Sequence, residues 1–94
     1  MKGMIGMGKE YDTRDIAKAL GITHGSLLGK IKRMRQKNGD FSRALRFGLY
    51  FDRGRNLPCW NISEVGMEIL AHTFNTHERK RRLLAMMESE GKEV

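Results

Sequence analysis

Apolar residues recur at helical spacing soon after the start of the chain. Ile16, Ala17 and Leu20 follow an i, i+1, i+4 pattern, which predicts a short amphipathic helix over residues 13–20. Gly21 comes directly after it, and glycine is the residue that most often takes the left-handed conformation at a helix C-terminus. We therefore expect the chain to turn sharply at this point.

A second helix is expected after a connection of about three residues. Thr23 is a suitable N-cap, and Asn38-Gly39 is a suitable end. The apolar positions between them are again helical in spacing: Leu27, Leu28, Ile31 and Met34. Because so short a connection prevents two helices from running antiparallel, the pair should cross at a steep angle, as in a helix-turn-helix unit.

The period then changes from helical to alternating. Residues 47–51 are aromatic and apolar, and residues 59–62 alternate around Trp60. The intervening segment, 52–56, has Gly54 at its centre and is rich in turn-forming residues. We expect the two apolar segments to pair as a β-hairpin with a basic tip.

Two more helices are expected, one capped by Ser63 and one capped by Thr76 that extends from about residue 77 to 90. The order is helix, helix, hairpin, helix, helix. It predicts an α+β fold that is mostly helical. More specifically, it predicts a winged helix-turn-helix, with a two-stranded hairpin as the wing and one or two C-terminal helices.

The length of 94 residues fits one domain. We expect a flexible N-terminal arm at 1–10, the winged helix-turn-helix domain at 11–75, and a C-terminal helix at 76–94 as a candidate dimerisation element. No apolar stretch approaches the roughly 20 residues of a membrane span. Cys59 is the only cysteine, so no intrachain disulfide is expected and a reducing cytoplasm is the predicted location.

The positive charge is concentrated in one part of the chain. Residues 30–55 hold nine basic and two acidic residues, so this segment accounts for the whole net charge of +7. A basic surface confined to one region is typical of proteins that bind a polyanion. Double-stranded DNA is therefore the predicted partner.

A second helix lying in a major groove would contact DNA through its first turn and through the face opposite the core. The candidate contacts on this helix are Thr23, His24, Ser26, Lys30, Arg33 and Lys37. Arg53 and Arg55 flank Gly54 at the hairpin tip and are candidates for phosphate or minor-groove contacts. Arg43 and Arg46, just before the hairpin, are expected to join them.

Two features are open to more than one interpretation. Gly25 and Gly29 would let the backbone of the second helix approach DNA closely, or they only lower its helix propensity by about 1 kcal/mol each. The basic run at 79–82 fits extra phosphate contacts, a partner surface or simple solvation equally well.

Catalytic and metal-binding chemistry is not indicated. The three histidines and the single cysteine lack metal-ligand spacing, and no nucleophile pairs with a histidine. We therefore expect no enzyme activity, cofactor, metal or small-molecule substrate. RNA binding would require aromatic residues stacked on an exposed sheet, whereas Tyr50, Phe51 and Trp60 are expected to be buried.

Two stretches of the sequence resemble a known family. The first is Thr-Arg-Asp-Ile-Ala at 13–17 followed by Thr23-His24, and the second is 50–66, with its glycine-centred turn, Pro58, an aromatic strand residue and Gly66. Together they resemble the phage regulatory proteins of the Rha family, over about residues 11–87. The resemblance implies a temperate-phage or prophage regulator with a winged DNA-binding domain, acting in the cytoplasm of a bacterial host cell.

The sequence thus favours a sequence-specific double-stranded DNA-binding transcriptional regulator that acts as a homodimer. The alternative is a protein–protein interaction module, an antirepressor or host-factor inhibitor, whose basic face binds an acidic partner. Salt dependence of binding to random duplex distinguishes the two, because each phosphate neutralised contributes a log–log slope of about −0.9.

Overall fold

The structure of the chain is a computed structural model that describes residues 9–91, with side chains described up to Glu88. The predicted N-terminal arm therefore lies mostly outside the described residues. In chain order the elements are β1 (Glu10–Asp12), α1 (Thr13–Leu20), α2 (His24–Lys37), α3 (Gly39–Arg43), β2 (Leu45–Asp52), β3 (Arg55–Ser63), α4 (Glu64–Ala71) and α5 (His77–Gly91). The three strands form one antiparallel sheet in the order β1-β3-β2. The predicted α+β class is confirmed.

The helix ends are set by the residues that the sequence indicated. Gly21 has a φ of 73°, and its N–H bonds to the carbonyls of the last turn of α1. The Thr23 hydroxyl accepts the N–H of Ser26 at 3.1 Å and so starts α2. The side chain of Ser63 caps α4 in the same way. These local rules hold because each cap satisfies a backbone group that the helix itself leaves unpaired.

Two short elements were not predicted. Glu10 belongs to strand β1, so the predicted arm at 1–10 extends too far. Asn38 ends α2 and also begins α3, because its side-chain oxygen accepts the N–H of Phe41 at 3.1 Å. Both elements are too short for an apolar period to reveal them.

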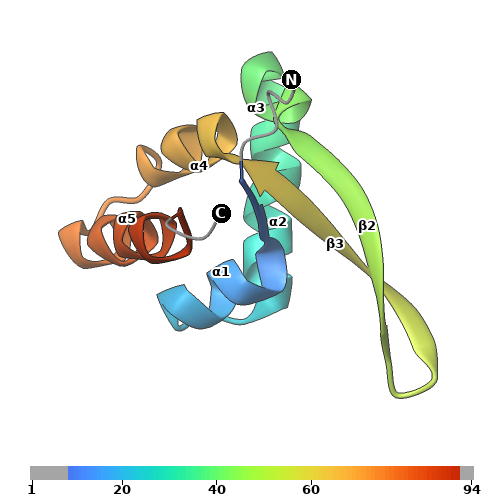
Figure 1. Cartoon of the computed structure of the whole chain (residues 1–94). Coiled ribbons are helices and arrows are strands. Elements are labelled where there is room, and N and C mark those ends of the chain that lie inside the picture. The colour runs from blue at the N-terminus through green and yellow to red at the C-terminus, as the bar shows by residue number, and fades with distance from the viewer. Residues whose placement is uncertain (1–8, 92–94) are drawn as a thin grey trace, which may run out of the picture.

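The hairpin is longer than predicted and turns in two residues. Asp52 pairs with Arg55, and the turn residues Arg53 and Gly54 have φ values of 54° and 80°. Two positive φ values in a two-residue loop match a type I′ turn, whose twist suits a hairpin. Figure 1 shows the hairpin extending away from the helices.

The expectation that Phe51 is buried is wrong, because its exposed fraction is 71%. Tyr50 and Trp60 are half-buried. The sheet face that carries buried Ile62 near the helices also carries Phe47 and Phe51. Since the hairpin continues beyond the helices, the same apolar face passes from the core into solvent.

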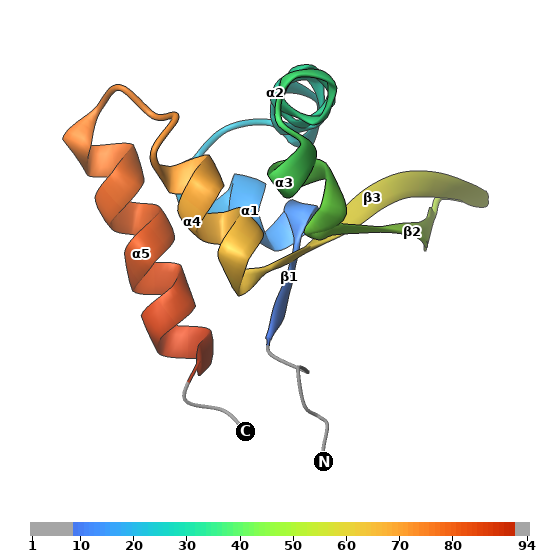
Figure 2. The ribbon, with the colours of Figure 1, turned by 90° about the horizontal axis from the view of Figure 1, so that it is seen from above.

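The last helix belongs to the same core as the rest of the chain. Leu83 of α5 is fully buried, and the Tyr11 hydroxyl lies 3.4 Å from the carbonyl of Met87. Arg82 also reaches the carbonyl of Leu20 at 3.4 Å. Figure 2 shows α5 beside α4 and α1. One core therefore holds α5 and the earlier elements together, rather than α5 forming a separate C-terminal unit.

Candidate nucleic-acid interface

Helix α2 exposes a face with little side-chain bulk. Figure 2 shows α2 on the side of the molecule opposite β1, with the α4–α5 connection to one side of it and the hairpin to the other. Because Leu27 and Ile31 are buried, the helical period places Gly25, Gly29 and Gln36 on the outward face. A Cβ added at Gly25 would meet nothing within 4 Å. A rod-like partner could therefore approach the α2 backbone closely.

The outward face of α2 is bordered by exposed cations that form no ion pair with the residues that the structure describes. Lys32, Arg33 and Lys37 are exposed, and none of them forms an ion pair with any described residue. An exposed Ser26 lies near the start of the same helix. The charge is thus available to a ligand instead of being used inside the fold.

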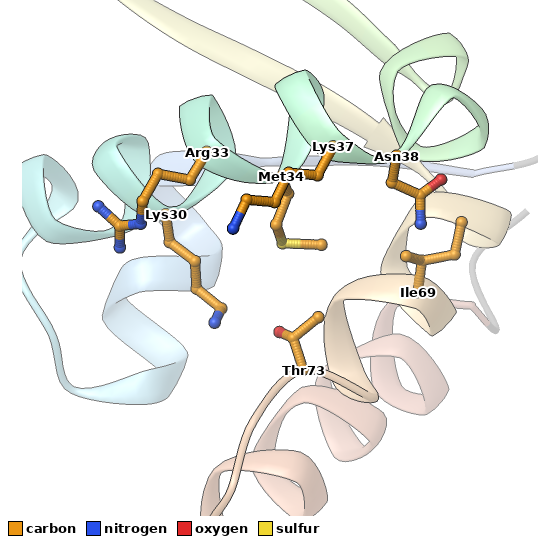
Figure 3. Close-up of a pocket in the computed structure, with 7 residues that line it drawn as sticks. All are labelled: Lys30, Arg33, Met34, Lys37, Asn38, Ile69 and Thr73. Atoms are coloured by element: carbon orange, nitrogen blue, oxygen red, sulfur yellow. The ribbon is translucent and has the colours of Figure 1, made fainter.

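Lys30 does not extend outward as the sequence suggested. It is half-buried, and its ammonium lies 4.9 Å from the centre of the Phe74 ring. Burial lowers the pKa of Lys30, and the nearby charges of Arg33 and Arg79 lower it further. Figure 3 shows the Lys30 side chain extending from α2 toward the side of the helix on which Thr73 lies. Lys30 therefore lines a hollow beside α2 and does not face a ligand that would contact the outward face of the helix.

Two predicted contacts at the start of α2 have structural roles. Thr23 uses its hydroxyl as the helix cap. The Nε2 atom of His24 lies 2.8 Å from the hydroxyl of buried Thr13, which also accepts the N–H of Trp60 at 3.1 Å. Burial lowers the pKa of His24, the charge of Asp12 opposes this shift, and Arg14 adds to it. His24 is neutral at pH 7 and ties α2 to α1 and, through Thr13, to β3.

The hairpin is joined to the helices through two aromatic residues, a feature that sequence reasoning missed. The guanidinium of Arg14 lies 4.2 Å from the centre of the Tyr50 ring, and that of Arg35 lies 4.8 Å from the centre of the Trp60 ring. Cation–π contacts of this kind contribute about 0.5–2 kcal/mol, depending on solvent exposure. They fix the hairpin relative to α1 and α2. From the sequence, Arg14 and Arg35 could be identified only as basic residues, because their aromatic partners are distant in the chain.

Arg14 is held by a carboxylate as well. Asp12 accepts its backbone N–H at 2.7 Å and its guanidinium at 2.8 Å. Burial by itself would raise the pKa of Asp12, but the hydrogen bonds and the charge of Arg14 outweigh it and lower the pKa. The Asp12 carboxylate is therefore ionised at neutral pH and orients the Arg14 side chain over Tyr50.

The basic residues near the hairpin fall into two groups. Arg43 forms an ion pair with Asp40, and Arg46 pairs with Glu10 at 2.5 Å. Arg53 and Arg55 at the tip are exposed, and neither forms an ion pair within the described part of the chain. The available charge of the hairpin therefore lies at its tip.

The described residues were also compared with the requirements of a metal site, a reactive cysteine and a membrane-spanning helix. Within residues 9–91, no three His, Cys, Asp or Glu side chains come together in a way that could hold a metal ion. Cys59 is buried, and burial raises the pKa of its thiol. None of the helices described here is both long enough and apolar enough to cross a membrane.

Comparison with known proteins gives no relative on which a function could be based. No protein-family model matches the chain, and no curated protein or solved structure matches it. The resemblance to the Rha family therefore stays a prediction, and the function must be argued from the surface itself.

Proposed function

We propose that the protein binds double-stranded DNA and regulates transcription, with α2 in the major groove and the β2–β3 hairpin as a wing. The observation that carries the proposal is the outward face of α2. It combines exposed backbone at Gly25 and a half-buried position without a side chain at Gly29 with exposed cations along its edge that form no ion pair with any described residue. A face of this kind suits a helix that enters a groove between two rows of phosphates.

The hairpin tip supports the same proposal. Arg53 has a φ of 54°, a conformation that asparagine and glycine adopt more easily than arginine. Backbone strain of this kind often accompanies a functional role for the side chain. Arg53 and Arg55 would contact the backbone or the minor groove beside the site occupied by α2.

The hairpin is held against the helices, which would let α2 and the hairpin contact the same duplex. Arg14 and Arg35 hold the hairpin strands against α1 and α2 through Tyr50 and Trp60. A wing held in this way loses less conformational freedom when it meets DNA than a free loop would. The ion-paired Arg43 and Arg46 are left out of the proposed interface.

We further propose that two copies act together as a phage or prophage regulator. A single module of this size buries roughly 600–1,000 Å² on DNA, which gives limited affinity by itself. Two half-sites would give a regulator useful specificity.

Replacing Gly25 and Gly29 together by alanine tests the close approach of α2. Alanine has room at both positions, with only Arg33 Nη1 near Gly29 at 3.7 Å, so the variant should be more stable by about 1–2 kcal/mol. The two added methyl groups lie on the proposed contact face, so affinity for duplex DNA should fall roughly tenfold, or about 1.4 kcal/mol. Thermal melting and fluorescence anisotropy with a labelled duplex measure the two effects.

A Gly39→Ala variant is the matched control, because Gly39 lies in α3, outside the proposed interface. It should bind as the wild type does. If the double variant is stabilised and binds DNA as tightly as the wild type, α2 does not approach the duplex as proposed.

A further inference from the structure

A groove runs between α2 and the last two helices. It consists of two adjoining hollows of about 390 and 380 Å³, both lined by Lys30, Arg33 and Thr73. Figure 3 shows the first hollow, with α2 on one side and Ile69 and Thr73 of the α4 region on the other. The second hollow continues past Phe74 to the start of α5. The groove thus lies along one flank of α2.

The lining of the groove is strongly one-sided in charge. It includes four cationic side chains and no aspartate or glutamate: Lys30, Arg33, Lys37 and Arg79. The half-buried ammonium of Lys30 is close enough to Arg33 and Arg79 for both charges to lower its pKa. Each hollow is lined by three of these cations, which repel one another, so an anion placed in either hollow would be attracted by all three.

The structure also divides the basic run at 79–82 into residues with different roles. Arg82 pairs with Glu78 at 2.7 Å and reaches the Leu20 carbonyl, so it is used inside the fold. Arg81 is exposed and does not line the groove. Arg79 lines the groove and has no ion pair with any described residue. Arg79 is therefore the α5 side chain that is placed to act together with α2.

We propose that this groove binds phosphate groups of the DNA backbone, so that α5 holds the duplex through Arg79 while α2 faces the bases. This inference rests on the proposed function. The side chains of Ser26, Lys30, Arg33 and Lys37 follow the flank of α2 next to its outward face. A DNA strand that borders the major groove occupied by α2 would pass along this flank. Lys30 and Lys37 are about 10 Å apart along the helix axis, which leaves room for about two phosphates.

The assignment keeps Lys30 as a DNA contact but moves it from the outward face that the sequence suggested to the groove beside it. Its ammonium is oriented by the Phe74 ring into a groove that bases in a duplex do not enter. Phosphate contacts fix the position of a protein on DNA but carry no direct sequence information. Removing Lys30 or Arg79 should thus weaken binding to every duplex by a similar factor.

The test measures affinity for a random duplex over a range of salt concentrations for the wild type, Arg79→Gln and Arg81→Gln. Loss of one phosphate contact makes the log–log slope less steep by about 0.9 and lowers affinity roughly eightfold at about 0.1 M salt. Arg79→Gln should show this change. Arg81→Gln removes the same charge two residues away and should keep the wild-type slope. Lys30→Gln, as a second groove variant, should behave like Arg79→Gln.

The outcomes separate this inference from the proposed function. If the wild type binds DNA with a steep salt dependence but Arg79→Gln and Lys30→Gln keep its slope, the groove does not hold phosphate and only this inference fails. Equal losses in Arg79→Gln and Arg81→Gln would show a general effect of charge and would also overturn it. If the wild type does not bind duplex DNA at all, both proposals fail.

Discussion

A variant that combines Arg53→Asn with Arg55→Gln should lose roughly 60-fold in affinity for duplex DNA at about 0.1 M salt, the effect of two lost phosphate contacts. Both arginines are exposed at the hairpin tip without an ion pair among the described residues. Because Arg53 has a positive φ and Gly54 follows it, asparagine at this position gives an Asn-Gly turn, which the type I′ geometry favours. The variant should therefore be at least as stable as the wild type, and its weaker binding would not come from unfolding. Fluorescence anisotropy and thermal melting together measure the two properties.

The control for the hairpin variant is Arg43→Gln combined with Arg46→Gln. It lowers the net charge by the same amount, but these arginines are neutralised by Asp40 and Glu10. Exposed ion pairs of this kind contribute at most about 1 kcal/mol to stability, so the control should fold normally. It should bind within about twofold of the wild type, because it removes no phosphate contact. Equal losses in the two double variants would mean that only net charge matters, and the wing would have no role.

Replacing Gly66 by alanine should destabilise the fold by about 2–3 kcal/mol, the upper part of the range for overpacking a core. Gly66 is buried in the first turn of α4. An added Cβ would lie 2.6 Å from Ile62 Cγ2 and 2.9 Å from Ala44 Cβ. Neither atom is the far end of a flexible side chain, so the backbone itself must move. In a domain of this size such a loss lowers the melting temperature by roughly 10–20 °C.

Thermal or urea unfolding of Gly66→Ala measures this effect, with Gly39→Ala as its control. A Cβ at Gly39 would lie 3.5 Å from Arg43 Nη1, which is an ordinary contact with a flexible side chain. The control should remain within about 0.5 kcal/mol of the wild type, as surface substitutions usually do. A Gly66→Ala variant as stable as the control would contradict the close packing of α4 on the junction between α3 and β2.

The parts of the fold that local chemistry determines could be predicted from the sequence. Gly21, Thr23 and Ser63 each satisfy a helix end through their own backbone or side chain, and all three behave as the sequence indicated. The hairpin was also visible, because its glycine-centred turn is a local feature. Strand β1 was not, since its pairing with β3 joins residues about 50 positions apart and depends on the tertiary fold.

The candidate site was predicted in part. The exposed positions of Arg33, Lys37 and Arg53 agree with the predicted faces of the helix and the hairpin. The ion pair of Arg46 was not predictable, because Glu10 lies 36 positions away on another strand. The pair of Arg43 with Asp40 has helical i, i+3 spacing, but it was missed because helix α3 was not predicted. The groove was missed for a similar reason. It forms only where α4 and α5 pack beside α2, and the sequence does not show which helix faces meet.

The central claim is that unpaired cations on α2 and the hairpin tip bind DNA phosphates. Its most direct test is the affinity of the wild-type protein for a random duplex, measured by fluorescence anisotropy between about 0.05 and 0.3 M salt. Five exposed cations on these two elements form no ion pair with any described residue: Lys32, Arg33, Lys37, Arg53 and Arg55. If at least four of them neutralise phosphates, log affinity should fall against log salt with a slope of about −3.6 or steeper. A flat response, or no binding at the lowest salt concentration, would contradict the account and favour an acidic protein as the partner of this surface.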